Sequence, residues 1–148
     1  MRHLKAGRKL GRSSAHRYSL YRNLVAELLT HDRIRTTDEK AKEVRRWAER
    51  MVTLGKAGTL ASRRRALAFV RDEDAVRRLF ADVAPRFADR AGGYTRIVKL
   101  GRRVGDAAAI SLIELTGTSE SVEPAKKRRA PRRAAADATG KGGARAAG

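Results

Sequence analysis

The side chains best suited to chemistry in this sequence are cations, and they gather at its beginning. The first twelve residues, MRHLKAGRKLGR, hold five Lys or Arg and no acidic residue. Clustered cations neutralise phosphates and release their counterions, which is the main source of affinity for nucleic acid. Residues 1–12 can extend over about 40 Å, and Gly7 and Gly11 let the backbone approach a groove closely. We therefore expect a basic extended arm that becomes ordered on nucleic acid, with a solvated tail as the alternative.

Residues for any other chemistry are scarce. The three histidines, His3, His16 and His31, are far apart in sequence, and the chain has no cysteine. Neither pattern indicates a metal site. The sequence contains no nucleophile motif, P-loop or dinucleotide fingerprint, and the acidic run at residues 72–74 suits the start of a helix better than acid–base catalysis. We therefore expect no enzymatic activity, no cofactor, no bound metal and no small-molecule substrate.

The overall charge also indicates an anionic partner. The chain has 35 Lys and Arg against 16 Asp and Glu, a formal net charge of +19. Self-repulsion at this density opposes compact folding unless nucleic acid, an anionic membrane surface or an acidic protein neutralises it. No stretch approaches the roughly 18 apolar residues of a membrane span, and the N-terminus lacks the apolar run of a signal peptide. We expect a cytoplasmic protein that binds no membrane.

Composition divides the chain into three parts. After the arm (1–12), residues 13–118 mix charged and apolar side chains with clear periodicity, as in a compact domain. Residues 119–148 carry many Ala, Lys and Arg and almost no large apolar side chain, which predicts a disordered basic tail. The predicted fold class is α+β, a helix-rich single domain with a small sheet of about three strands.

Four amphipathic helices are expected in the compact domain. Their predicted beginnings are Ser13 or Ser14, a capping box formed by Thr36 and Glu39, Thr59 and Asp72. The first helix has no acidic residue in its first turn, so either the serine cap or a bound phosphate would complement its dipole. The second helix is expected to end near Gly55 or Gly58, with Trp47 in the core rather than serving as a base-stacking platform. Pro85 is expected to disrupt the fourth helix.

Strands are expected at three places. The β-branched run within HDRIRTT favours a short strand, and residues 94–100 and 107–115 read as two more. The loop between these last two, residues 101–106, is flanked by glycines. Arg102 and Arg103 at its tip should project outward without acidic neighbours. The hairpin is therefore a second candidate surface for a polyanion.

Three segments together resemble bacterial large-subunit ribosomal protein seventeen. They are MRHLKAGRKLGRSSAHRYSLYRNL, IRTTDEKAKEVRRWAERMVTLGKAG and GGYTRIVKLGRRVGDAAAISLIEL. The likeness spans roughly residues 1–116 in the expected order, and the tail lies outside the usual family core. It implies a non-enzymatic structural protein of the ribosome, with a compact α+β domain bound to large-subunit rRNA. It also implies neighbouring large-subunit ribosomal proteins on the solvent side, near the polypeptide exit region.

The resemblance further implies which side chains contact rRNA. Along the arm and the first helix they are Arg2, His3, Lys5, Arg8, Lys9, Arg12, Arg17, Arg22 and Asn23. Around the late hairpin they are Arg96, Lys99, Arg102 and Arg103. The choice of rRNA over DNA rests on the resemblance alone.

Two other function classes stay open from the residues themselves. A DNA-compacting protein of the nucleoid would suit the basic, Ala-rich tail from residue 125 onward, but it usually needs a dimer or a groove-reading element. An enzyme acting on RNA would need an acid–base or metal cluster, and the sequence indicates none.

Overall fold

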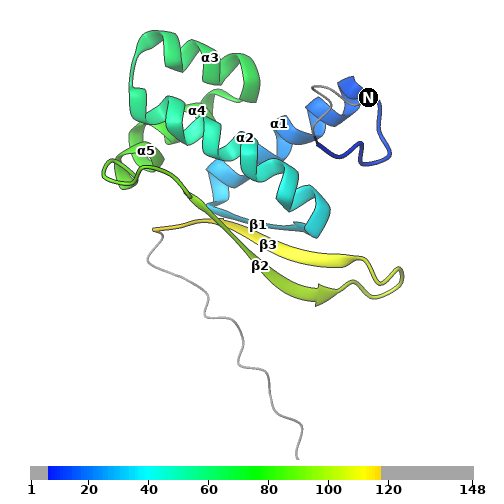
Figure 1. The fold of residues 1–148 in the computed structure, drawn as a ribbon. Coiled ribbons are helices and arrows are strands. Elements are labelled where there is room, and N and C mark those ends of the chain that lie inside the picture. Colours follow the sequence, from blue (N-terminus) through cyan, green and yellow to red (C-terminus); the bar gives the residue numbers. More distant parts are fainter. Residues whose placement is uncertain (1–6, 118–148) are drawn as a thin grey trace, which may run out of the picture.

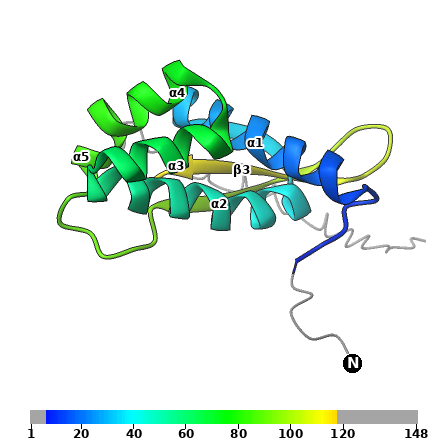
Figure 2. The same ribbon diagram turned by 90° about the horizontal axis from the view of Figure 1, so that it is seen from above.

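The computed structural model describes residues 7–117, in which helices cover one face of a small antiparallel sheet (Figures 1 and 2). The helical elements are α1 (Ser14–His31), α2 (Asp38–Ala57), α3 (Leu60–Val70), α4 (Glu73–Arg78), a π-helical turn η1 (Leu79–Val83) and α5 (Ala84–Arg86). The strands are β1 (Arg33–Thr37), β2 (Thr95–Arg102) and β3 (Ala109–Leu115). This arrangement confirms the predicted α+β fold class. The predicted contacts of Arg2, His3 and Lys5 and the predicted disorder of residues 119–148 lie outside the described range.

The sheet has the strand order β1–β3–β2, so the last strand lies in the middle. Both pairings are antiparallel, and Ile113 of β3 is aligned with Ile34 on one side and Ile97 on the other. Because side chains alternate along a strand, Ile113 and Leu115 face the helices and belong to the hydrophobic core. That core is aliphatic in the main. Its helical contributions include Val25, Leu28 and Leu29 of α1 and Val44, Met51 and Val52 of α2.

The expected helix starts are confirmed at Ser13, Thr59 and Asp72, but the capping box is wrong. Asp72 accepts hydrogen bonds from the backbone N–H groups of the next helical turn, at 3.0 and 3.1 Å. Thr36 cannot cap α2 because it is still extended in β1, paired with Ser111 of β3. The N-cap is Thr37, whose side chain makes no capping bond. Strand and helix therefore follow each other without a connecting loop.

The two glycines expected near the end of α2 have different roles. Gly58 ends the helix in the left-handed conformation, with φ 64°, and its N–H donates to the carbonyl of Gly55. Gly55 is buried inside the helix, where a Cβ would lie 3.0 Å from Ala84 and 3.2 Å from the Leu79 side chain. The missing side chain thus lets α2 pack closely against η1 and α5.

Pro85 disrupts the helical path less than expected. The chain stays helical through Arg86, beyond the proline. A proline has no N–H to donate to the preceding turn, and the turn before it widens into η1, where the N–H of Ala84 donates to the carbonyl of Leu79 five residues earlier. The π-turn accommodates the proline without breaking the helix direction.

Gly55→Ala tests the close packing of α2. Alanine would favour the helix by about 0.5–1 kcal/mol, but overpacking typically costs about 1–3 kcal/mol, and the nearest neighbour is a Cβ that no rotamer change can move. We expect the free energy of unfolding in urea to fall by about 1 kcal/mol. The double variant Gly55→Ala/Ala84→Gly makes room for the new methyl group, so the two changes should be coupled. A Gly55→Ala protein as stable as wild type, or more stable, contradicts the packing described.

Candidate nucleic-acid interface

Segments far apart in sequence meet at one end of the molecule. The described part of the arm, the start of α2 and the loop between β2 and β3 lie together there, whereas α5 lies at the opposite end (Figures 1 and 2). Both cation-rich surfaces expected from the sequence are therefore at the same end. The fold brings them together because α2 runs the length of the molecule and β3 pairs with the strand that leads into it.

The arm is anchored to α2 by two acids. The backbone N–H of Arg8 donates to Glu43 Oε1 at 3.2 Å, and its guanidinium Nη1 lies 3.3 Å from the same oxygen. The Arg8 guanidinium also forms an ion pair with Glu39. The arm has no acidic neighbour in sequence, but the fold supplies two from a helix more than thirty positions away. Arg8 therefore fixes where the arm leaves the domain.

Residues 7–12 form a turn against the domain in this structure. The N–H of Arg12 donates to the carbonyl of Lys9 at 3.2 Å, and Leu10 and Gly11 both have positive φ. Leu10 packs against the hydrophobic core. Arg12 Nη1 donates to the Leu10 carbonyl at 2.7 Å, and Arg17 Nη1 donates to the Arg12 carbonyl at 3.3 Å. These two arginines thus hold the turn against the beginning of α1.

The other predicted contacts on the arm and α1 are placed differently. Lys9 and Asn23 are exposed. Arg22 is half-buried, with its guanidinium 6.0 Å from the centre of the Phe69 ring. Trp47 stacks on Phe69 at 4.7 Å and on Tyr21 at 6.1 Å. These ring contacts, together with its packing against the core, make Trp47 a packing residue, as expected.

The hairpin cations also differ in their exposure and in their pairing with acids. Lys99 and Arg102 are exposed. Arg96 Nε donates to Glu114 Oε1 at 2.6 Å, and that carboxylate is 3% exposed. The expectation that the hairpin arginines lack acidic neighbours is wrong for Arg103.

Arg103 and Asp106 form a two-pronged ion pair within the hairpin loop. Arg103 Nε and Nη2 lie 3.0 and 2.6 Å from the two Asp106 oxygens. The bonds from Arg103 and from the backbone N–H of Ala108 hold the pKa of Asp106 well below its usual range. The same pair raises the pKa of Arg103. The guanidinium is thus fixed in orientation and fully charged.

A buried hydrogen bond ties the hairpin to α2. Ser111 Oγ, fully buried in β3, donates to Asp38 Oδ1 at 3.0 Å, and Lys42 Nζ lies 2.6 Å from Asp38 Oδ2. The pKa of Asp38 is lowered, first by the bond from Lys42 and then by the bond from Ser111. The aspartate therefore stays charged and fixes the hairpin relative to the helix that holds the arm.

Known proteins resemble this chain over most of the domain described above. The family model described as Ribosomal protein L17 matches residues 20–116, about two thirds of the chain. The chain belongs to the ribosomal protein L17 family. Its membership confirms the resemblance seen in the sequence, and it agrees with the expectation that the chain is not an enzyme.

Members of the L17 family that resemble this chain are named large ribosomal subunit protein bL17. The protein from Trichlorobacter lovleyi is 57% identical over 115 residues, which cover 78% of this chain and 93% of the relative. The protein from Geobacter metallireducens is 52% identical over 139 residues, which cover 94% of this chain and 77% of the relative. The L17 family match begins within α1, so it includes the hairpin and leaves out the arm.

Other kinds of site are not seen in the part of the chain that the structure describes. Between residues 7 and 117 no group of three or more His, Asp or Glu side chains is arranged to hold a metal ion. No helix in the same range is long and apolar enough to cross a membrane.

Two cations that the sequence reasoning missed lie at the same end. They are Arg35 of β1 and Lys40 of α2, neither of which has an ion pair with another described residue. The alternation in Arg33-Ile34-Arg35 places both arginines on the face of the strand opposite the core residue Ile34, and this signal could have identified Arg35. Nothing in the local sequence singles out Lys40.

The link between Asp38 and Ser111 predicts a specific pH dependence. The pKa of Asp38 in the folded chain lies below the ordinary value of 3.8, so near pH 4 the folded state binds fewer protons than the unfolded state. Its stabilising effect is complete well above that pH and is lost as the pH falls through the folded pKa. In urea titrations from pH 6 to 3, Asp38→Asn should lose less stability than wild type.

Ser111→Ala tests the same bond at neutral pH. Because it removes a buried hydrogen bond to a charged group, we expect the free energy of unfolding to fall by about 1–3 kcal/mol. An Asp38→Asn protein with the wild-type pH dependence, together with an unaffected Ser111→Ala protein, would show that the bond does not secure the hairpin.

Proposed function

We propose that this chain is a structural component of the bacterial large ribosomal subunit that binds folded rRNA through its basic end. Family membership supports the ribosomal role, since relatives more than 50% identical are named large-subunit proteins. The observation that carries the binding surface is the meeting of arm, α2 start and hairpin at one end (Figure 1). A surface built from several segments suits a folded RNA, which is recognised largely by its shape and its phosphates.

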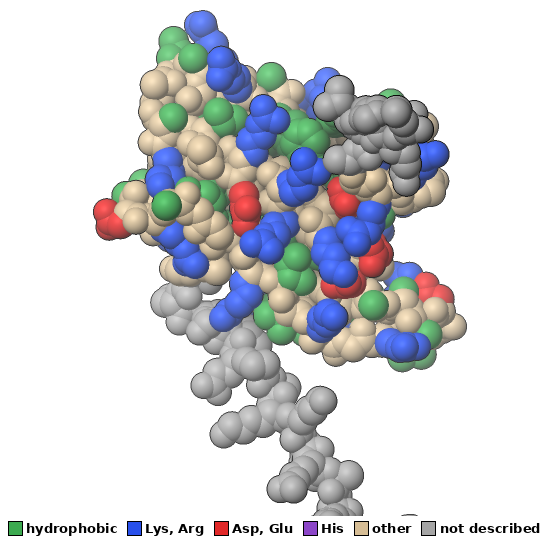
Figure 3. Space-filling model, viewed as in Figure 1, with side chains coloured by type: hydrophobic (Ala, Val, Ile, Leu, Met, Phe, Trp, Pro, Cys, Tyr) green, Lys and Arg blue, Asp and Glu red, His purple; other side chains and the backbone are tan. Residues whose placement is uncertain are grey.

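Internal ion pairs separate the cations that hold the fold from those available to RNA. Acidic side chains lie between the cationic ones on the face seen in Figure 3. We propose that Lys9, Lys99 and Arg102, which are exposed, make direct phosphate contacts. Arg8 and Arg96 then act chiefly by fixing the arm and the hairpin, because their guanidinium groups are paired with Glu43 and Glu114.

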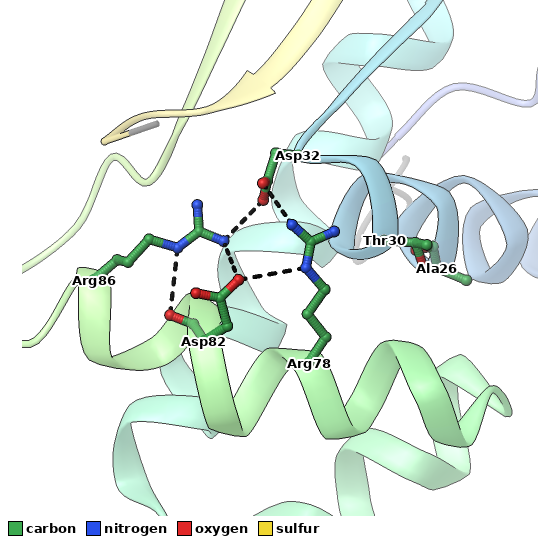
Figure 4. A network of polar contacts seen from close by, with 6 residues as sticks. All are labelled: Ala26, Thr30, Asp32, Arg78, Asp82 and Arg86. Carbon is green, nitrogen blue, oxygen red and sulfur yellow. Dashed lines mark hydrogen bonds and ion pairs between the residues drawn. The ribbon is translucent and has the colours of Figure 1, made fainter. Parts of the chain in front are cut away.

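The opposite end of the molecule is less suited to a polyanion. Asp32 lies between Arg78 and Arg86, 2.7 Å from Arg78 Nη2 and 3.0 Å from Arg86 Nη2 (Figure 4). Asp82 pairs with the same two arginines, at 3.4 and 3.0 Å (Figure 4). Two acids neutralise two cations there, and the network joins the end of α1 to α4 and α5. These arginines therefore stabilise the fold rather than bind phosphates.

The resemblance also supplies the proposed surroundings. We propose that the chain works in the cytoplasm, on the solvent side of the large subunit near the polypeptide exit region, beside other large-subunit proteins. Residues 1–12 are proposed to enter the rRNA, with Arg2, His3 and Lys5 continuing the cationic path beyond Arg8.

The salt dependence of RNA binding tests the proposed surface. For each phosphate that the protein no longer neutralises, the slope of log affinity against log salt should fall by about 0.7–0.9. Replacing Lys9, Lys99 and Arg102 with Gln should therefore lower the slope for large-subunit rRNA by about 2–3 units, measured by filter binding. The matched control replaces three exposed arginines at α3 and its C-cap, Arg64, Arg65 and Arg71.

The control variant should keep the wild-type slope. Equal effects of the two triple variants would mean that binding is diffuse and not confined to the basic end. Duplex DNA that competes as well as rRNA would favour the DNA-compacting class instead.

A further inference from the structure

A hollow at the basic end lies between β1, the start of α2 and the hairpin. Its volume is about 390 Å³, and it is lined by Arg35, Thr36, Thr37, Lys40, Arg103 and Ile110. Apart from the isoleucine, every lining residue carries a hydroxyl or a positive charge. The family match and the resemblance assign no role to it, and two of its three cations were not among the residues expected to contact rRNA.

Three cations from three elements converge on this hollow without an acid in its lining. Arg35 comes from β1, Lys40 from α2 and Arg103 from the loop after β2. Within residues 7–117, Arg35 and Lys40 have no ion pair or hydrogen bond through their side chains. Like charges held around a small space repel one another, and a bound anion removes that cost. The lining therefore indicates an anion.

The acids nearest in sequence to Arg35 and Lys40 bind other partners, and Asp106 is paired with Arg103 itself. Asp38 is occupied by Ser111 and Lys42, and Glu39 by Arg8. Both acids also satisfy the dipole at the start of α2, so the site depends on the converging side chains and not on the helix end.

The chemistry of the lining suits a phosphate. A guanidinium offers two parallel N–H groups that match a pair of phosphate oxygens, while an ammonium adds a compact charge. The two-pronged match is open to Arg35, whereas Asp106 occupies Nε and Nη2 of Arg103 and fixes that guanidinium. Arg103 therefore offers Nη1, which makes no bond to another described residue. The hydroxyls of Thr36 and Thr37 add neutral donors. Thr37 is free to do so because it makes no side-chain capping bond.

We propose that this hollow seats a backbone phosphate of RNA, held by Arg35, Lys40 and Arg103. The inference rests on the proposed function and deepens it. The phosphate would lie between the hairpin and the helix that anchors the arm, so the two cationic surfaces would follow one continuous RNA backbone.

Replacing the two newly assigned cations, Arg35 and Lys40, tests the proposed phosphate site. Because both hold the same phosphate, Arg35→Gln, Lys40→Gln and the double variant should each weaken rRNA binding, and the double variant should lower the salt slope by only about 1 unit. Arg64→Gln on α3 is the matched control and should bind as wild type does. Urea unfolding of each variant verifies that the substitutions at exposed Arg35 and half-buried Lys40 leave the fold intact.

The position of the RNA can be mapped directly because the chain has no cysteine. An iron chelate attached to Val104→Cys, next to Arg103 and 99% exposed, should cut large-subunit rRNA at one local group of nucleotides. Lys40→Gln in the Val104→Cys background should weaken or disperse the cuts.

The outcomes separate this inference from the proposed function. Wild-type protein that fails to prefer rRNA over duplex DNA defeats the proposed function. If wild-type protein prefers rRNA but Arg35→Gln/Lys40→Gln binds it with unchanged affinity and salt slope, only the proposed phosphate site is overturned. Phosphorus NMR of inorganic phosphate provides the last test. Broadening that depends on Lys40, without any effect of Lys40→Gln on rRNA binding, would identify a small-anion site and overturn the assignment to RNA.

Discussion

Three acids with little exposed surface hold the arm, the start of α2 and the β2–β3 hairpin of this molecule in place. Asp38, Glu43 and Glu114 are 8%, 8% and 3% exposed. Each binds a cation, in the pairs Asp38–Lys42, Glu43–Arg8 and Glu114–Arg96. A chain with a net charge of +19 repels itself, and breaking such a pair would leave a poorly hydrated charge without its partner. The same contacts therefore permit a compact fold and decide which cations face outward.

This division of the cations makes the two ends of the protein electrostatically different. Internal pairs neutralise the arginines between α1 and α4, whereas Lys9, Lys99 and Arg102 at the other end remain exposed. The buried bond between Asp38 and Ser111 joins the hairpin to the helix on which the arm rests. Binding energy from both surfaces can then act on one RNA without the cost of bringing the segments together.

Local patterns in the sequence predict the elements well. The helix beginning at Asp72 follows from its side chain, and the strand at residues 94–100 follows from its β-branched residues. The capping box failed because its threonine is held in β1 by pairing with Ser111, some seventy-five residues later. Gly55 looked like a helix end because its close neighbour, Ala84, lies 29 positions later and no local pattern reveals that contact. Errors of this kind arise where tertiary contacts override a local preference.

The candidate site was predictable in its location more than in its chemistry. A run of cations without nearby acids marked the arm and the hairpin. The acids that pair with Arg8 lie at least thirty positions away, and the one that pairs with Arg96 lies eighteen positions away. No local pattern could show that these arginines are occupied, or that Arg35 and Lys40 from different elements line the same hollow.

Lysine acetylation compared between free protein and assembled large subunits tests the central claim most directly. The account predicts that Lys9 and Lys99, both exposed in the protein itself, become strongly protected together in the subunit. Lys56, near the opposite end of α2, serves as the internal reference. If Lys9 and Lys99 react equally in the free protein and in the subunit, the basic end does not face rRNA and the account is wrong.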